Sequence, residues 1–126
     1  MPNMEIEFNN PNEQNNYLLF ATELENDPNV LFHGTSEICA LSIIKNGFSP
    51  NGSLSSSSFA RTSAGSLSYA CSTRTDVIRG AVLAARFNSL NVLGIKQEGD
   101  VVYLYDHQIH PEIVAYSFIP VSYRFV

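Results

Sequence analysis

Residues 29–48 read NVLFHGTSEICALSIIKNGF, and this segment predicts a short strand followed directly by a helix. The apolar run at residues 29–33 has the length of a buried strand. Gly34 interrupts that run, and Ser36 is a residue type that caps the N-terminus of a helix. Apolar residues then recur at helical spacing through residues 37–46, and Gly47 stands where the C-terminus of a helix favours a left-handed backbone.

The rest of the chain contains short apolar runs that predict a strand-rich second half. Residues 61–71 carry small apolar residues at intervals of three and four, which predicts a second helix despite Gly65. The serine-rich residues 53–60 fit either a strand or a loop. Four further runs have the length of strands, namely residues 81–87, 101–105, 113–119 and 123–126. Two early helices followed by several strands predict an α+β domain.

The composition of the 126 residues narrows the class of protein. A chain of this length with 44% apolar residues predicts one domain with one buried core. Residues 1–28 read as a polar, asparagine-rich leader, in which residues 17–21 are a candidate for a short interface helix. The leader lacks the pattern of a secretion signal and no run is long enough to span a membrane, so we expect a cytoplasmic protein. The formal charge of −5 disfavours a nucleic-acid partner held by electrostatic attraction.

Cysteine and histidine are few and show no metal-binding spacing. We expect Cys39 and Cys71 to be two reduced thiols, and a single disulfide between them is the alternative. His107 and His110 are expected in a solvated loop. His33 is the candidate for chemistry, because it ends a predicted strand beside a glycine, where a ligand can approach the main chain closely. The alternative is an ordinary strand-end histidine that is hydrogen-bonded to a loop.

The motif LFHGT at residues 31–35, followed by IIKNGF at residues 43–48, resembles the first NAD-binding motif of the poly(ADP-ribose)-polymerase-like ADP-ribosyltransferases, the diphtheria-toxin-like or His-Tyr-Glu class. Residues 66–70, 81–87 and 102–112 resemble the later helix, strand and closing segment of that family, in the same order. The resemblance implies one catalytic domain over residues 1–126. It further implies two small, mostly antiparallel sheets packed around an NAD cleft, with helices outside.

The resemblance implies a role for each matched residue. His33 would bind ribose hydroxyls of the nicotinamide half of NAD, and Gly34 would offer main-chain groups to the nicotinamide carboxamide. Ser66 would contact the same carboxamide, and Tyr69, on the same face of the predicted helix, would stack on the nicotinamide ring. A solvated helix serine and a half-buried core tyrosine are the alternatives. The expected NAD-binding residues are His33, Gly34, Thr35, Ser58, Phe59, Ser66 and Tyr69, with no metal.

Two positions depart from the family pattern. Ser58 stands where the family has a tyrosine at the end of a strand, and Phe59 is the neighbouring aromatic residue. Val101 stands at the matched position of the family's catalytic glutamate, and the nearby acidic residues are Asp100 and Glu98. The expected catalytic residues are therefore His33, Tyr69 and Asp100, with Glu98 as the alternative carboxylate.

These features predict a mono-ADP-ribosyltransferase, which breaks the nicotinamide–ribose bond of NAD and transfers ADP-ribose to an acceptor, most readily a protein. Absence of the glutamate should disfavour chain elongation more than transfer itself. The alternative is a degenerate domain of the same fold that binds NAD or a protein partner, and NAD hydrolysis and RNA 2′-phosphotransfer rank lower. A domain of this size suits an effector, a toxin or a small metabolic enzyme. Arg61, Arg74 and Arg79 are expected as solvated charges, with pairing to the NAD pyrophosphate as the alternative.

Overall fold

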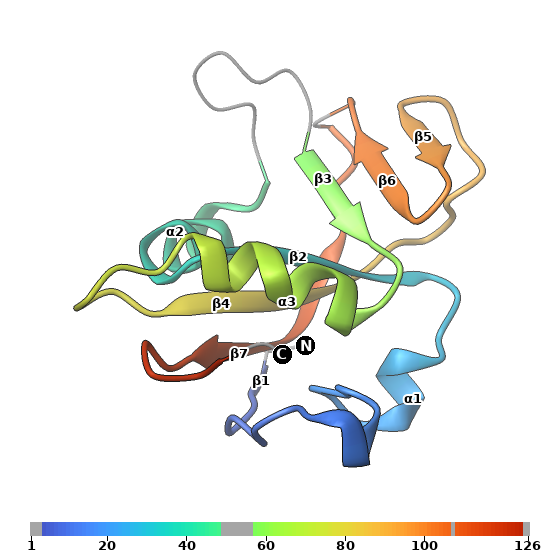
Figure 1. The fold of residues 1–126 in the computed structure, drawn as a ribbon. Helices are drawn as coiled ribbons and strands as arrows, with labels where there is room; N and C mark the ends of the chain where they lie inside the picture. The colour runs from blue at the N-terminus through green and yellow to red at the C-terminus, as the bar shows by residue number, and fades with distance from the viewer. Residues whose placement is uncertain (1–3, 49–56, 107, 125–126) are drawn as a thin grey trace.

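The helices lie in the first part of the chain and four strands follow the last helix, and together these elements build an α+β structure around one sheet (Figure 1). The computed structural model describes residues 4–48, 57–106 and 108–124. The elements, in chain order, are β1 Met4–Glu5, η1 Glu13–Asn15, α1 Thr22–Glu25, β2 Val30–Ser36, α2 Glu37–Asn46, β3 Ser57–Ala60, α3 Ser63–Ser72, β4 Gly80–Arg86, β5 Ile95–Glu98, β6 Val101–Leu104 and β7 Glu112–Ile119. Within those described ranges, no helix is both long and apolar enough to cross a membrane.

The strands form a single seven-stranded sheet with the order β1-β7-β4-β2-β3-β6-β5. Every neighbouring pair is antiparallel except β1 and β7, which run parallel. The prediction of two separate sheets is therefore wrong, because strand pairing continues across the whole assembly. The join is narrow: in the described part of the chain, β2 and β3 share only the pair Phe32 and Ala60. Beyond this pair, β3, β5 and β6 turn away from the direction of β2 and β4 (Figure 1).

The first strand and helix form as predicted, but the strand is longer. β2 continues through Gly34 and Thr35 to Ser36, because it pairs with β4 along its full length. Pairing with β4 outweighs the weak strand preference of glycine, so Gly34 lies inside the strand and does not interrupt it. The predicted start of the helix is confirmed, because the Ser36 hydroxyl accepts a hydrogen bond from the Cys39 amide at 3.3 Å. Gly47 ends α2 with a φ of +81°, but its ψ of 176° differs from the left-handed helical conformation that the sequence predicts.

Most of the later elements agree with the sequence patterns. The predicted helix at residues 61–71 corresponds to α3, and the predicted strands at residues 81–87, 101–105 and 113–119 correspond to β4, β6 and β7. β3 takes the last four residues of the serine-rich segment, of which residues 53–56 lie outside the described residues. β5 has no predicted counterpart, because its mostly exposed sequence IKQE lacks an apolar run.

The strand expected at residues 123–126 does not form at Tyr123 and Arg124, and residues 125 and 126 lie outside the described residues. Tyr123 is instead buried in the core, where its hydroxyl donates a hydrogen bond to the Pro11 carbonyl oxygen at 2.6 Å. The guanidinium of Arg74 donates to the Tyr123 carbonyl oxygen at 2.7 Å. These side-chain contacts hold the segment in place without pairing it to the sheet.

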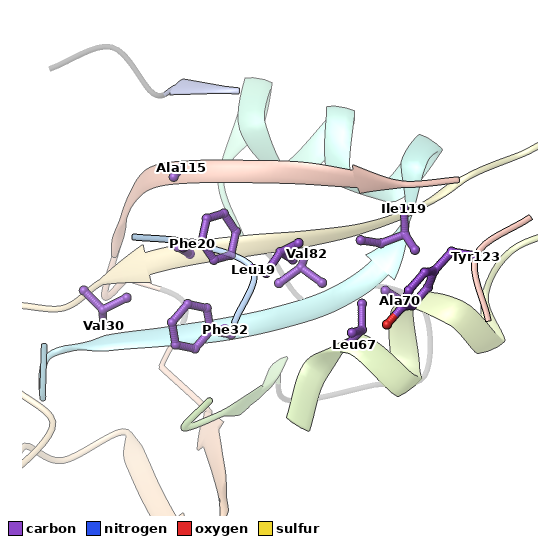
Figure 2. Packing of buried hydrophobic residues seen from close by; sticks show 11 residues of the cluster. Leu19, Phe20, Val30, Phe32, Leu67, Ala70, Val82, Ala115, Ile119 and Tyr123 are labelled. Carbon is purple, nitrogen blue, oxygen red and sulfur yellow. The ribbon is translucent and has the colours of Figure 1, made fainter. Parts of the chain in front are cut away.

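The leader is part of the core, and the interface helix predicted at residues 17–21 is wrong. Leu19 and Phe20 are buried, and the Phe20 ring stacks on the Phe32 ring of β2 with 5.7 Å between the centroids (Figure 2). The segment is held by side-chain contacts, not by a helical turn. The Glu25 carboxylate accepts hydrogen bonds from the amides of Leu19 and Phe20 and from the Ser63 hydroxyl at the start of α3.

The helices α2 and α3 cover opposite faces of the sheet. Leu67 and Ala70 of α3 pack in a buried cluster with Phe32 of β2, as Figure 2 shows. Ala40 of α2 packs in a second buried cluster with Leu31 of β2. Neighbouring residues of a strand point to opposite faces, so β2 contributes to both clusters.

Candidate functional site

A small cavity of about 120 Å³ lies at the join of β2 and β3, beside α3. Its wall consists of Phe32, Gly34, Ser58, Phe59, Ala60, Ser66, Tyr69, Val101 and Tyr103, which come from β2, β3, α3 and β6. Pockets for drug-sized ligands measure roughly 300–1,000 Å³, so this cavity has room for one small planar group. A larger hollow of about 550 Å³ near Pro11 and Tyr123 contains none of the expected site residues.

Gly34 determines how closely α3 approaches the sheet. A β-carbon at Gly34 would lie 2.1 Å from the Ser66 carbonyl oxygen and 3.0 Å from the Ala70 amide nitrogen. Gly80 on the neighbouring strand β4 has the same relation to the helix, since a β-carbon there would lie 2.2 Å from the Ala70 carbonyl oxygen. The two glycines therefore let the helix main chain lie directly on the strands, which brings Ser66 and Tyr69 to the cavity.

The helix α3 contributes one buried hydroxyl and one exposed ring. The Ser66 hydroxyl is buried and donates a hydrogen bond to the Ser63 carbonyl oxygen at 2.9 Å. Its oxygen keeps lone pairs that can accept a hydrogen bond from an amide N–H. Tyr69, three residues later, is 62% exposed and forms part of the cavity rim. The core-tyrosine alternative for Tyr69 is thus wrong, and so is the solvated-serine alternative for Ser66.

The opposite wall comes from β3 and β6. Ser58 is paired directly with Tyr103, and Ala60 is paired with Val101. Directly paired residues share one face of a sheet, so these four side chains face the same side. The alternating side chains of Phe59, Val102 and Leu104 pack in the core on the other face, so Phe59 borders the cavity without directing its ring into it. The pairing of Ser58 with Tyr103 therefore places an aromatic ring beside Ser58, although Ser58 itself stands where the family has a tyrosine.

His33 is connected to the site through the main chain of Ser58. Its Nδ1 atom lies 2.7 Å from the Ser58 carbonyl oxygen, and its ring packs against Phe48 and Phe59 with centroid distances of 5.2 and 5.4 Å. Burial lowers the pKa of His33, and the hydrogen bond to Ser58 raises it by a smaller amount. His33 and Thr35 alternate with Gly34 along β2, and neither belongs to the cavity wall.

The two candidate carboxylates occupy different places. Glu98 of β5 is paired directly with Val101 and so shares the cavity-facing side of the sheet. It forms an ion pair with Lys96 at 3.2 Å, and its side chain is 51% exposed. Asp100 is exposed in the turn between β5 and β6 and does not belong to the cavity wall. Neither carboxylate belongs to the cavity wall, and the strand register favours Glu98 because its side chain shares the cavity-facing side of the sheet.

The three arginines are engaged in contacts within the protein. Arg61 donates to the Gly99 carbonyl oxygen at 3.2 Å and to the Gln97 side chain, which anchors the turn between β5 and β6. Arg74 binds carbonyl oxygens near the C-terminus, and Arg79 forms a two-point ion pair with Glu37. Of the three, only Arg61 adjoins a cavity residue.

The cysteines and acidic groups add no further site. Cys39 and Cys71 are free thiols on different helices, and burial raises the pKa of Cys71. Among the residues that the structure describes, no group of three or more His, Cys, Asp and Glu side chains is arranged to hold a metal ion.

Five of the seven expected NAD-binding residues meet in one cavity. Val101 and Tyr103 also line this cavity, and neither was expected to bind NAD. Alternation along VVYL predicts that Val101 and Tyr103 share a face, but only the strand register shows that this face meets Ser58. Comparisons with protein-family models, with curated proteins and with solved structures find no match to this chain. A proposal for its function must therefore rest on the geometry of this cavity.

Proposed function

We propose that the protein is a mono-ADP-ribosyltransferase of the poly(ADP-ribose)-polymerase-like class, with NAD as its substrate. One observation carries the proposal: Gly34 of β2, Ser58 and Phe59 of β3, and Ser66 and Tyr69 of α3 line the same small cavity. These residues come from three separate segments, of which those in β2 and α3 resemble the family motifs, whereas Ser58 in β3 departs from them. Their convergence is hard to explain if the motifs arose by chance.

The cavity suits the nicotinamide end of NAD. Its volume of about 120 Å³ leaves room for the pyridinium ring and its carboxamide, so the remainder of the dinucleotide would extend outside. Tyr69 offers a ring face to a flat cation, and the Ser66 oxygen can accept from the carboxamide N–H. Gly34 also borders the cavity, and we propose that its main chain bonds the nicotinamide carboxamide.

The reaction would break the bond between C1′ of the ribose and the nicotinamide nitrogen. The bonding electron pair leaves with nicotinamide, which becomes neutral, and C1′ develops positive charge. A nucleophile of the acceptor then bonds to C1′ and loses its proton. Binding of the ring in a slot that favours this separation lowers the barrier, because the site then binds the transition state better than intact NAD. We propose a protein acceptor and a cytoplasmic location.

His33 and Glu98 are the residues that we propose to act on the ribose. A carbonyl oxygen only accepts hydrogen bonds, so Nδ1 of His33 carries the proton that bonds to Ser58 and Nε2 is left with a lone pair. The lowered pKa keeps the ring neutral at pH 7, so that Nε2 can accept from a ribose hydroxyl. Glu98 stands beside Val101 on the cavity-facing side, where a carboxylate would stabilise positive charge at C1′.

The test is incubation with NAD that carries ³²P in its adenylate phosphate, in the presence of soluble proteins as acceptors. We expect label on protein with the wild type and none with His33→Ala, whereas the exposed His110→Ala serves as the matched control and labels normally. Equal labelling by wild type and His33→Ala would contradict the proposal. Release of nicotinamide, measured in the same samples, separates transfer from NAD hydrolysis.

A second candidate is a domain that binds NAD without turning it over. The specific observation in its favour is Val101, which puts an aliphatic side chain in the cavity wall at the position matched to the family's glutamate. Calorimetric titration with carba-NAD, which lacks the labile glycosidic bond, measures binding alone. Binding of carba-NAD combined with no nicotinamide release from NAD would favour this second function over transfer.

A further inference from the structure

Two tyrosines border the cavity from different elements. Tyr69 comes from α3, and Tyr103 comes from β6 on the wall that β3 and β6 build. Tyr103 is half-buried, whereas the next tyrosine along the chain, Tyr105, is 46% exposed and lies outside the cavity wall. The rings of these two neighbours are 6.2 Å apart. Tyr103 is therefore the aromatic residue that β6 directs to the site.

The position of Tyr103 is set by its pairing with Ser58. Directly paired residues in antiparallel strands have β-carbons about 4.5–5.5 Å apart and lie on one face. The serine side chain is short, so the larger ring on the neighbouring strand covers the space beside it. The aromatic group that the chain lacks at Ser58 is thus present one strand away, at the same level along the sheet.

The surroundings of Tyr103 are compatible with a cationic ring. Lys96 is paired directly with Tyr103 on its other side, and its ammonium group would repel a pyridinium if it were left unbalanced. The Glu98 carboxylate lies 3.2 Å from that ammonium group and offsets its charge. The carboxylate also raises the pKa of Lys96. Apart from this ion pair, the wall beside Tyr103 consists of the uncharged residues Ser58 and Val101.

We propose that Tyr103 is the second stacking residue of the site, so that the nicotinamide ring of NAD is held between Tyr103 and Tyr69. This inference rests on the proposed function and extends it to a residue to which the resemblance assigns no role. Tyr103 takes over, across the β3–β6 ladder, the aromatic contact for which Ser58 is too short. Its contribution concerns the nicotinamide ring alone, because the cavity has no room for the adenylate half of NAD.

The test compares three ligands that differ in the ring. Carba-NAD and nicotinamide contain it, whereas ADP-ribose lacks it. Titration calorimetry of Tyr103→Leu should show binding of carba-NAD weakened about tenfold, as expected for loss of a cation–π contact. Binding of nicotinamide, whose ring is uncharged, should weaken by a smaller factor of about three through the lost stacking contact. ADP-ribose should bind this variant as it binds the wild type. Leucine keeps an apolar side chain at the half-buried position, and the thermal unfolding midpoint verifies that the variant is folded.

Two further variants make the test specific. Tyr103→Phe keeps the ring and should bind carba-NAD like the wild type, and Tyr105→Ala, which removes the tyrosine outside the cavity, should do the same. Unchanged carba-NAD affinity in Tyr103→Leu would overturn the role of Tyr103 and leave the proposed function intact. An equal loss of ADP-ribose binding would also overturn it, because the effect would then be structural. If the wild type bound none of the three ligands, the proposed function itself would be overturned.

Discussion

The Nδ1 atom of His33 lies 2.7 Å from the main-chain carbonyl oxygen of Ser58. This contact joins β2 to β3 next to the single strand pair, Phe32 and Ala60, that connects the two parts of the sheet in the described chain. It also fixes the proton of the imidazole on Nδ1, since the partner can only accept. One hydrogen bond thus supports the join of the sheet and the tautomer that the proposed reaction needs.

The stability of the protein should depend on pH through His33. Burial lowers its pKa in the folded state below the ordinary value of 6.5, so the unfolded chain binds a proton first as the pH falls. The free energy of unfolding should therefore stay constant above pH 6.5 and decrease below it. Urea denaturation at pH 7.5 and pH 5.0 measures the difference, and His33→Gln should reduce it. If His110→Gln removed the dependence and His33→Gln did not, the assignment would be wrong.

Replacement of Gly34 should disrupt the packing of α3 on the sheet. The added β-carbon would meet the main chain of Ser66 at 2.1 Å, and a main-chain atom cannot move without shifting the helix. We expect Gly34→Ala to lower the free energy of unfolding by about 3 kcal/mol, as for overpacked cores. Gly99→Ala, in the turn between β5 and β6, is the control: in the described part of the chain, no atom outside its chain neighbours lies within 4 Å of the added β-carbon, and its φ of +62° should cost only about 1 kcal/mol. Equal urea midpoints for the two variants would contradict this account.

The two carboxylates near Val101 should differ in their effect on NAD cleavage. Glu98 shares the cavity-facing side of the sheet, and Asp100 lies in the adjoining turn. We expect Glu98→Gln to slow nicotinamide release about a hundredfold, the magnitude typical of a lost electrostatic contact to a transition state. Asp100→Asn should release nicotinamide at the wild-type rate. The opposite ranking of the two variants would show that Asp100 is the acting carboxylate.

Glu25 should be important for folding although it does not belong to the cavity wall. Its carboxylate accepts hydrogen bonds from the Leu19 and Phe20 amides and from the Ser63 hydroxyl, and so it fastens the leader to α3. Glu25→Ala should lower the free energy of unfolding by about 2 kcal/mol, because the partners of a charged acceptor are left unpaired. The exposed Glu23→Ala on the same helix should change it by less than about 0.5 kcal/mol. Similar thermal midpoints for both variants would mean that the leader contributes little to stability.

Local patterns in the sequence predict the elements whose ends depend on nearby residues. Ser36 and Gly47 mark the ends of α2 because capping involves only residues within one helical turn. The strands β4, β6 and β7 are predicted correctly because each contains one apolar run, which is also a local signal. Other features have no local signal, among them the polar edge strand β5 and the burial of Leu19 and Phe20, which depends on Phe32 and Glu25.

The candidate site also combines residues that a local sequence pattern indicates with contacts that only the folded chain shows. Motif spacing indicates Gly34, Ser66 and Tyr69, since each belongs to a short segment with a recognisable pattern. Strand register decides the contacts between these segments. It determines that the His33 ring packs against Phe59, that Ser58 is paired with Tyr103 and that Val101 is paired with Glu98. Register is decided by which strands meet in the folded chain, and a shift by one residue would reverse every side chain between core and cavity. The residue types were therefore readable in the sequence, whereas their neighbours across the sheet were decided only by tertiary packing.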